Sequence, residues 1–383
     1  MTGPAVHPFL MAMLCGSGTE TFLRRAPGEM DWEGIARDAA KHGLTPLLSR
    51  EINRTGMARR LPAGLAARLE EELFGLAARN MMLANELGGI LRALQERQLL
   101  CAPLRGLDLA ERLYGDLTAR PMGDLDLLVR KEDLPEVTVI LRDLGYREVD
   151  RRAGFAQAFG NTLEFYKDRH GWIVAEPHWT IAYPPFVDRV DMKGVWQRCA
   201  RGRVAGVETW VLAPEDLLLH LCLHLTHRDG TAPLLWFYEL DRLVRQEAAA
   251  LDWSRLVATA REAGLASLLS GTLTKVGALF DTPLPDPVLD QLAGTPLANR
   301  EGRLVRMLAG GSSVDGKESL AVFFTLKGMR AKLRYALALL FPSPEFMRLE
   351  YELTSGMQLA LSYLQRFRFL MWEGCKGIVR LFA

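Results

Sequence analysis

The sequence has few cysteines, no long apolar run and almost no excess of either charge. Its five cysteines are scattered along the chain, and no two of them form a C-x-x-C pair: Cys15, Cys101, Cys199, Cys222 and Cys375. This pattern argues against a disulfide framework and a zinc ribbon, and it predicts buried thiols in a reducing compartment. No uninterrupted run of about 18 apolar residues occurs, so we expect a cytoplasmic protein without a membrane span.

The balance of charge excludes one broad class of partner. The 47 basic and 46 acidic residues leave a net charge of +1. A chain with so little net charge has no whole-molecule field that steers it onto nucleic acid, so a long nucleic-acid substrate is not indicated. With 383 residues, of which 49% are hydrophobic, the chain is long enough for about two or three domains with cores of their own.

Helical patterns flank a central region of short apolar runs. We predict an N-terminal helical region at 1–98, an α/β core at 99–212, a helical domain at 213–310, and a linker with C-terminal amphipathic helices at 311–383. The core mixes strands with helices, which predicts an α+β fold built on a small mixed β-sheet. The strands are expected at 99–104, 124–129, 162–167, 172–181 and near 208–212.

Two carboxylates open the apolar run at 124–129. In an extended strand side chains alternate between faces, so Asp124 and Asp126 point to one side while Leu125 and Leu127 point into a core. Two carboxylates on one face repel each other unless a cation lies between them, and such oxygen ligands suit Mg²⁺ or Mn²⁺ better than zinc. The pair predicts a metal site for phosphoryl or nucleotidyl transfer, although D-x-D also occurs in glycosyltransferase metal sites and on solvated strand edges.

A third acidic residue lies in a later apolar run, from Trp172 to Trp179. A carboxylate in such a run is unfavourable by on the order of a few kcal/mol unless a cation or hydrogen bonds compensate it, so Glu176 is a candidate third ligand. The alternative is an edge strand on which Glu176 points to water, because Pro177 cannot donate to a sheet ladder. His178 shares the face of Glu176 and is a candidate for orienting a substrate phosphate, although such histidines are more often structural.

These segments belong to a longer series of motifs. The first part comprises Leu104 to Ala110 with Tyr114, then Arg120, the run from Gly123 to Val129, and Gly145-Tyr146. The second part comprises Glu176-Pro177-His178-Trp179, Leu212 to His224, Trp236 with Leu240-Asp241, and Asp31-Trp32. Together they resemble the uncharacterised bacterial nucleotidyltransferase family of the DNA polymerase β superfamily, and the resemblance covers most of the chain.

The resemblance implies a metal-dependent nucleotidyltransferase. Asp124, Asp126 and Glu176 would be its catalytic residues and would hold two divalent ions, Mg²⁺ or Mn²⁺. The substrates would be a nucleoside triphosphate and an unidentified hydroxyl acceptor, which is a small molecule, a sugar or a protein, and pyrophosphate would be released. The nucleotide and phosphate contacts would come from Arg105, Gly106, Arg120, Gly123 and His178.

The glycine turn departs from the pattern of the wider superfamily. Gly106-Leu107 stands where a Gly-Ser pair is usual, so the turn keeps its backbone N–H groups for a triphosphate but lacks the serine hydroxyl. Arg105 or Arg120 would supply the lost contact, or an arginine would form a salt bridge beside Asp124. The missing serine also motivates an alternative function, a catalytically inactive binding or scaffold protein peripheral to a membrane assembly.

Two further patterns have alternative interpretations. His220, His224 and His227 share one face of an expected helix, but the sequence lacks H-E-x-x-H, so packed histidines, or one at the active-site cleft, fit better than a zinc site.

Residues 320–383 carry nine basic and four acidic residues among aromatic ones, which suits a surface for an anionic membrane or a protein partner. Instead of such a surface, we favour a pair of C-terminal helices that covers the core, because Pro342-Ser343-Pro344 divides this segment into short helices.

Overall fold

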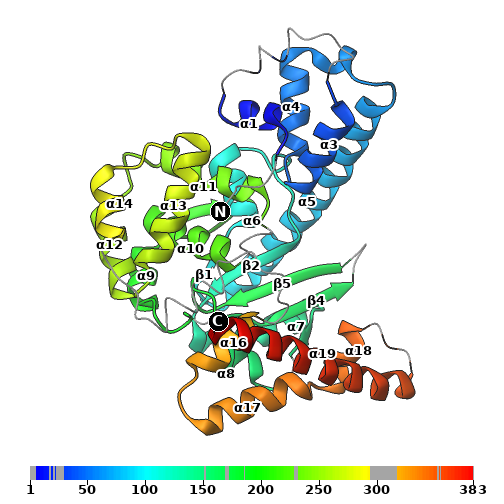
Figure 1. The fold of residues 1–383 in the computed structure, drawn as a ribbon, viewed down its shortest axis with the longest axis vertical. Helices are drawn as coiled ribbons and strands as arrows, with labels where there is room; N and C mark the ends of the chain where they lie inside the picture. Colours follow the sequence, from blue (N-terminus) through cyan, green and yellow to red (C-terminus); the bar gives the residue numbers. More distant parts are fainter. Residues whose placement is uncertain are drawn as a thin grey trace.

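A mixed five-stranded sheet lies near the middle of the molecule, with helices packed around it (Figure 1). The computed structural model describes residues 6–16, 19, 22, 30–150, 152–168, 172–184, 186–227, 232–293, 317–351, 353 and 355–382. The predicted α+β fold is confirmed. The strands of this sheet are β1 (Cys101–Pro103), β2 (Asp124–Val129), β3 (Arg147–Val149), β4 (Glu164–Asp168) and β5 (Trp172–His178).

The strand order makes β5 a central strand. Across the sheet the order is β1-β2-β5-β4-β3, with β2 and β5 parallel and the other neighbouring pairs antiparallel. The edge-strand interpretation of Glu176 is therefore wrong. Pro177 is tolerated because the paired register between β5 and β4 ends at Ala175, and beyond it the Pro177 carbonyl accepts a hydrogen bond from the Leu163 N–H.

The alternation of side chains in β2 decides which groups enter the core. Leu125 and Leu127 point into a cluster that α5 (Leu65–Glu96) and α7 (Leu134–Asp143) cover, where Ile90 and neighbouring leucines of α5 form an apolar stripe. Asp124 and Asp126 lie on the opposite face of β2, as predicted, because side chains two residues apart in a strand point the same way.

Polar side chains of α5 hold the loop that precedes β2. Asn80 is fully buried, and its Nδ2 donates to the carbonyl oxygens of Leu117 and Arg120 at 2.5 and 2.8 Å. Arg79 donates to the Gly123 carbonyl oxygen at 3.3 Å. The long helix therefore fixes the loop that carries Arg120 and Gly123 relative to the sheet.

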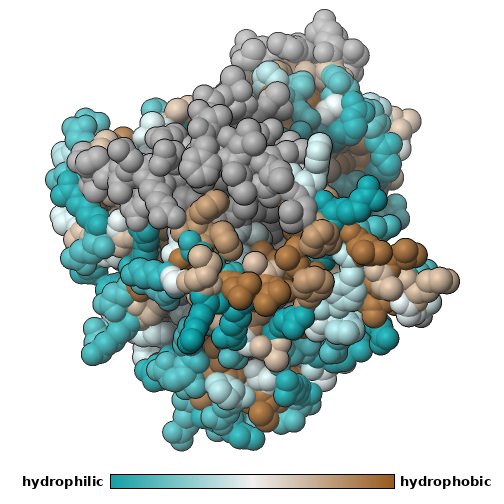
Figure 2. Space-filling model, turned by 60° about the horizontal axis from the view of Figure 1, so that its bottom comes forward, coloured by the Kyte–Doolittle hydropathy of each residue, from teal (hydrophilic) through white to brown (hydrophobic). Residues whose placement is uncertain are grey.

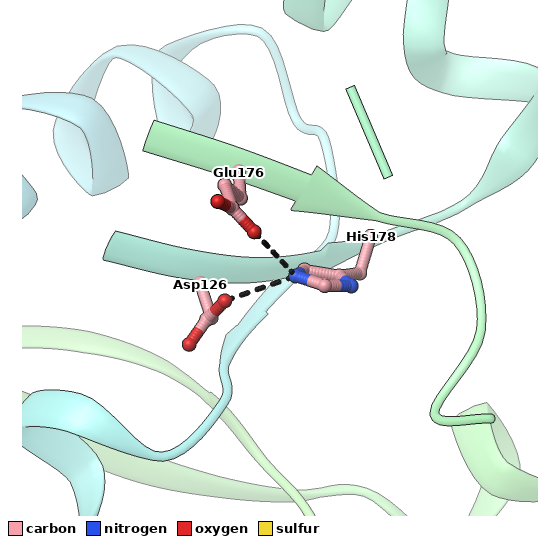
Figure 3. Close-up of side chains that lie close together, drawn as sticks. All are labelled: Asp126, Glu176 and His178. Carbon is pink, nitrogen blue, oxygen red and sulfur yellow. Dashed lines mark hydrogen bonds and ion pairs between the residues drawn. The ribbon is translucent and has the colours of Figure 1, made fainter. Parts of the chain in front are cut away.

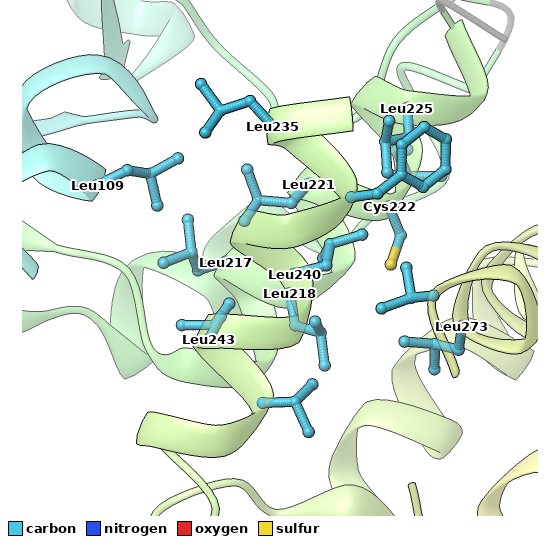
Figure 4. Packing of buried hydrophobic residues seen from close by; sticks show 14 of the residues in the cluster. Leu109, Leu217, Leu218, Leu221, Cys222, Leu225, Leu235, Leu240, Leu243 and Leu273 are labelled. Atoms are coloured by element: carbon cyan, nitrogen blue, oxygen red, sulfur yellow. The ribbon is translucent and has the colours of Figure 1, made fainter. Parts of the chain in front are cut away.

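The N-terminal helices and the helices after the sheet share one hydrophobic core. A single cluster of buried side chains extends from Phe9 to Leu292, and Figure 4 shows part of it, with leucines of α10 and α11 packed together. At the start of α3, Asp31 accepts a hydrogen bond from the Gly34 N–H at 2.9 Å, as expected of an N-cap. The predicted domain boundaries stay predictions. The helices are α1 (Pro8–Leu14), α3 (Trp32–Lys41), α4 (Thr45–Thr55), α10 (Pro214–His227), α11 (Leu234–Gln246), α12 (Trp253–Glu262), α13 (Ala266–Phe280) and α14 (Asp286–Ala293).

A second, two-stranded sheet pairs β6 (Ala200–Val204) with β7 (Val207–Val211). β7 corresponds to the strand expected near 208–212, whereas β6 and β3 were missed because their charged residues leave no apolar alternation. The Thr209 hydroxyl of β7 donates to the Cys101 carbonyl oxygen at 2.8 Å, which joins the two sheets. The remaining short helical segments in the described part of the chain are η2 (Met57–Arg60), α6 (Gly106–Leu109), η3 (Ala110–Tyr114), η4 (Lys131–Asp133), α8 (Phe155–Phe159) and α9 (Met192–Arg198).

Four C-terminal helices pack near α8: α16 (Lys317–Thr325), α17 (Met329–Leu340), α18 (Pro344–Glu350) and α19 (Gly356–Phe382). Phe159, Val322 and Tyr335 form a small core between them and α8. Because α19 has 27 residues, the expectation of only short helices after Pro342-Ser343-Pro344 is wrong. Within the described residues, no helix is both long and apolar enough to cross a membrane. Residues 311–316 of the expected linker lie outside the described residues.

The cysteines follow the prediction with one exception. Cys101, Cys199 and Cys222 are buried free thiols, whereas Cys15, just after α1, is an exposed free thiol. The expectation of burial is therefore wrong for Cys15. The side chain of Cys375 lies outside the described residues.

Candidate active site

All eight predicted site residues line one pocket of about 440 Å³, which we call the site pocket. They come from the glycine turn before α6, the loop before β2, and strands β2 and β5. They are Arg105, Gly106, Arg120, Gly123, Asp124, Asp126, Glu176 and His178. The pocket also contains residues that the sequence analysis did not assign to a site: Pro121, Met122, Asn161, Thr162, Glu164 and Tyr183, together with His224 and Trp236.

Strand pairing places three acidic residues, one from each of three neighbouring strands, side by side across the sheet. Asp126 of β2 pairs with Glu176 of β5 in the parallel register. Phe165 of β4 pairs with Ala175, so the preceding residue, Glu164, lies opposite Glu176. A row of three acidic side chains therefore crosses the face of the sheet that borders the site pocket.

His178 joins two of these carboxylates (Figure 3). Its Nε2 atom lies 2.9 Å from Asp126 Oδ1 and 3.5 Å from Glu176 Oε2, and its Nδ1 atom lies 3.2 Å from Asn161 Nδ2. Burial by itself lowers the pKa of His178, but the hydrogen bonds with Asp126 and Glu176 outweigh it and raise the pKa to about 9. A protonated imidazolium therefore compensates the two carboxylates.

The metal-ligand set that the structure brings together differs from the predicted one. Asp126, Glu176 and His178 offer ligand atoms that all lie within 4.8 Å of one another. Asp124 is not part of this group, although it lines the same pocket. The charge of Asp126, followed by burial, raises the pKa of Asp124 to about 6, so its carboxylate is poorly compensated.

Both arginines of the site pocket form ion pairs. Arg105 Nη2 lies 2.6 Å from Asp126 Oδ2, and Arg105 Nη1 contacts the ring of His224. Burial raises the pKa of Asp126, but Arg105 and His178 hold it well below its usual range. Arg120 donates to Glu239 at 2.6 Å and to the Gly106 carbonyl oxygen at 3.0 Å. The salt-bridge interpretation of these arginines therefore describes the structure, with Asp126 and Glu239 as partners instead of Asp124.

The glycine turn has a strained backbone. Arg105 and Gly106 have φ angles of 43° and 40°, a region that side chains with a Cβ rarely adopt. A Cβ atom at Gly106 would find its nearest neighbours at 3.9 and 4.0 Å, on Asp124 and Met122. The backbone angle, not lack of space, therefore favours glycine at position 106.

Aromatic and imidazole rings form another wall of the site pocket. Tyr183 stacks on His220 with 5.7 Å between ring centroids, and His224 lies 4.3 Å from Trp236. His220 Nδ1 is 2.8 Å from the Ile181 carbonyl oxygen, and burial together with the charge of Arg105 lowers its pKa to about 3. His220 is thus a packed neutral histidine and His224 faces the pocket, while the side chain of His227 lies outside the described residues. A signal for this wall was present in the sequence, in the repeated spacing of the histidines.

The charges of the site pocket suit a divalent cation. Asp124, Asp126, Glu164 and Glu176 line it together with Arg105, Arg120 and the protonated His178, and Glu239 neutralises Arg120, so negative charge is in excess. Asp126 and Glu176, joined by His178 once its imidazole loses the proton, are able to hold a metal ion. The donor set therefore fits a divalent metal, and added positive charge would favour a polyanionic substrate.

The fold, a small mixed sheet with helical flanks, and its acidic pocket are compatible with a nucleotidyltransferase core. The family described as uncharacterised nucleotidyltransferase matches residues 28–281, so the chain belongs to this family. Comparison with curated proteins and with solved structures gave no match. The nucleotidyltransferase part of the resemblance is confirmed, whereas the polymerase β superfamily and a bacterial origin stay predictions.

Proposed function

We propose that this protein transfers a nucleoside monophosphate from a nucleoside triphosphate to a hydroxyl acceptor. The observation that carries the proposal is the cluster of Asp126, Glu176 and His178 in the pocket of a chain that belongs to a nucleotidyltransferase family. In this reaction an acceptor oxygen forms a bond to the α-phosphorus, the bond from that phosphorus to the bridging oxygen breaks, and pyrophosphate leaves with the electron pair.

The carboxylates would serve two purposes in this reaction. Asp126 and Glu176, with Asp124 beside them, would hold Mg²⁺ or Mn²⁺, which supplies positive charge for the triphosphate and the departing pyrophosphate. Glu176 is the most accessible member of the cluster, with 22% of its side chain exposed, compared with 2% for Asp126. We therefore assign to Glu176 the positioning of the acceptor hydroxyl and the acceptance of its proton.

The remaining predicted residues would bind phosphate or shape its site. Gly106 and Gly123 leave backbone rather than side chains at the pocket wall, where phosphate oxygens can approach N–H groups. Arg105 is the phosphate donor we favour, because a metal ion bound to Asp126 would compete with its ion pair, whereas Glu239, the partner of Arg120, is not among the predicted metal ligands. Arg120 would then keep the glycine turn in place, and His178 would orient the two carboxylates.

A second pocket supports a route for the acceptor. This cavity, of about 400 Å³, shares Asn161, Thr162 and Glu164 with the site pocket. Its other walls include Phe159 and Tyr335, from α8 and α17. An acceptor held there would reach Glu176 past Glu164.

The alternative function, a catalytically inactive binding or scaffold protein, has one observation in its favour. Both oxygens of Asp126 already have partners within the chain, because Oδ2 pairs with Arg105 and Oδ1 with His178. A site in which these partners stay on Asp126 would hold no metal ion on that carboxylate, and it would bind nucleotide without turnover. The two proposed functions therefore differ in whether a metal ion displaces these partners.

Pyrophosphate release separates the two functions. We would incubate the protein with each nucleoside triphosphate, Mn²⁺ or Mg²⁺, and a panel of small-molecule, sugar and protein acceptors, including the protein itself. The wild type should release pyrophosphate, and Asp126→Asn should reduce the rate by at least about 100-fold, because it removes a negative charge from the metal site.

The matched control is Glu33→Gln, which removes one charge from an exposed ion pair with Arg68 and should leave the rate unchanged. Equal pyrophosphate release by the wild type and Asp126→Asn would contradict the catalytic assignment. A rise in melting temperature with nucleotide, without pyrophosphate release under any condition, would support the inactive binding protein.

A further inference from the structure

The C-terminal helices expose large apolar side chains on their outer surface. Figure 2 shows a band of apolar residues across the side of the molecule that carries these helices. We call this surface the apolar helix face. Its members in α17 and α19 are Met329, Leu333, Leu337, Met357, Leu361, Leu364 and Trp372, and their exposed fractions range from 46% to 79%.

The pattern in α19 is unlike that of an ordinary surface helix. Ser362 is buried and Tyr363 is half-buried, with the Tyr363 hydroxyl 2.6 Å from the Pro342 carbonyl oxygen. Leu361 and Leu364 lie on the other side of the helix, with 54% and 63% of their surface exposed. A helix packed on one side usually carries polar residues on the other, so the fold does not require the leucines that lie with Arg368 on the outer side of α19.

α17 also exposes leucines on one side and buries residues on the other. Leu333 and Leu337 are one helical turn apart and exposed, whereas Tyr335 and Ala338 are buried against the rest of the protein. Arg366 of α19 donates to the Leu339 carbonyl oxygen at 2.9 Å, which holds the two helices together. The two apolar stripes therefore belong to one packed unit.

The charge around this face is positive. Residues 320–383 contain nine basic and four acidic residues, a balance of +5, in a chain whose total is +1. Arg330, Arg334 and Arg368 are exposed on the same two helices. The face also lies beyond residue 281, where the family match ends, so it is an addition to the matched nucleotidyltransferase region.

We propose that the apolar helix face binds the surface of a bilayer that contains anionic phospholipid. The helices would lie in the plane of the interface, with leucines and Trp372 among the acyl chains and arginines at the headgroups. The proposal places these helices on the membrane surface and not across the membrane, because no helix in the described part of the chain is long and apolar enough to cross it. The balance of +5 in residues 320–383, next to exposed leucines, complements the negative surface of a bilayer that contains anionic lipid.

The test is co-sedimentation of the full chain with phosphatidylcholine vesicles, with or without about 30% phosphatidylglycerol. Binding should be several-fold stronger with the anionic lipid and should weaken as NaCl is raised, because exposed charges are screened by salt. Leu361→Ser/Leu364→Ser should reduce the partition coefficient by at least about ten-fold, because it removes two buried leucines from the bound state.

The matched control replaces exposed apolar residues elsewhere. Phe74 and Met81 of α5 are 78% and 65% exposed, and Phe74→Ser/Met81→Ser should bind vesicles as the wild type does. Circular dichroism and urea unfolding of each variant establish that it is folded. Pyrophosphate release in solution reports on the site pocket separately and does not bear on lipid binding.

Three results would overturn the proposal. The first is absence of wild-type binding to both kinds of vesicle. The second is an equal loss of binding in the α5 and α19 variants. The third is a wild-type dimer in light scattering that Leu361→Ser/Leu364→Ser dissociates, without lipid binding, which would make the face a contact between two copies of the chain.

Discussion

The site pocket and the apolar helix face depart from the usual distribution of polarity in opposite directions. The pocket buries Asp126 and His178, each with 2% of its side chain exposed, whereas the C-terminal helices expose leucines and Trp372. The buried charges have compensating partners within the chain: His178 and Arg105 for Asp126, and Glu239 for Arg120. The exposed apolar side chains of the helix face have solvent on their outer side.

The two regions differ in whether the unfavourable groups have compensating partners. Buried ions require partners because transfer of an unpaired charge out of water is costly, so the pocket must be formed by the fold itself. Exposing a leucine to water costs less free energy than burying an unpaired charge, so a folded protein tolerates exposed leucines on its surface. We therefore expect changes in the pocket to reduce the free energy of unfolding strongly, and changes on the helix face to leave it almost unchanged.

The largest expected effect comes from breaking a buried pair. Arg120→Met leaves Glu239, with 2% of its side chain exposed, without its cation. The free energy of unfolding should fall by about 3–5 kcal/mol in urea titrations, because the remaining carboxylate is buried and unpaired.

Two variants sharpen this result. Arg68→Met breaks an exposed pair, with side chains 55% and 43% exposed, and should change the free energy of unfolding by less than about 1 kcal/mol. Arg120→Met/Glu239→Leu should be less destabilised than the sum of its single variants, because no unpaired charge remains. Equal losses in the free energy of unfolding for Arg120→Met and Arg68→Met would contradict this, because they would show that burial does not decide how much an ion pair contributes to stability.

An intermediate effect should appear in the pH dependence of stability. The pKa of His220 is lowered to about 3 in the folded protein, so the unfolded chain binds its proton more readily. The contribution of His220 to the free energy of unfolding is fully present above its unfolded-state pKa of about 6.5. This contribution is lost as the pH falls below that value. Between pH 7 and pH 4.5 the wild type should lose about 2–3 kcal/mol more than His220→Gln. Parallel curves for the two proteins in urea titrations would contradict a buried neutral His220.

The smallest effect should come from the helix face. Leu333→Gln/Leu337→Gln replaces residues that are 58% and 46% exposed. Its free energy of unfolding should stay within about 0.5 kcal/mol of the wild type, because surface substitutions remove little packing. A loss of more than about 2 kcal/mol would mean that other parts of the chain cover this face in solution, and the contrast with the pocket would fail.

Local patterns predicted a large part of the fold and the candidate site. The alternation in β2 placed Asp124 and Asp126 on one face and Leu125 in the core, because a strand has a period of two residues. The N-cap at Asp31 followed from its side chain and its position. The short strand β6 was missed because Arg201 and Arg203 interrupt any apolar pattern, and its pairing depends on the neighbouring β7.

Local sequence patterns were enough to identify a pair of aspartates, a later glutamate and a glycine turn that together resemble a nucleotidyltransferase. The tertiary structure decided their surroundings. It made β5 central, so that Glu176 lies beside Asp126, and it placed His178 between them. It also paired Arg120 with Glu239, 119 positions away. Such partners depend on strand register and helix packing, which distant segments set together, and no local pattern contains that information.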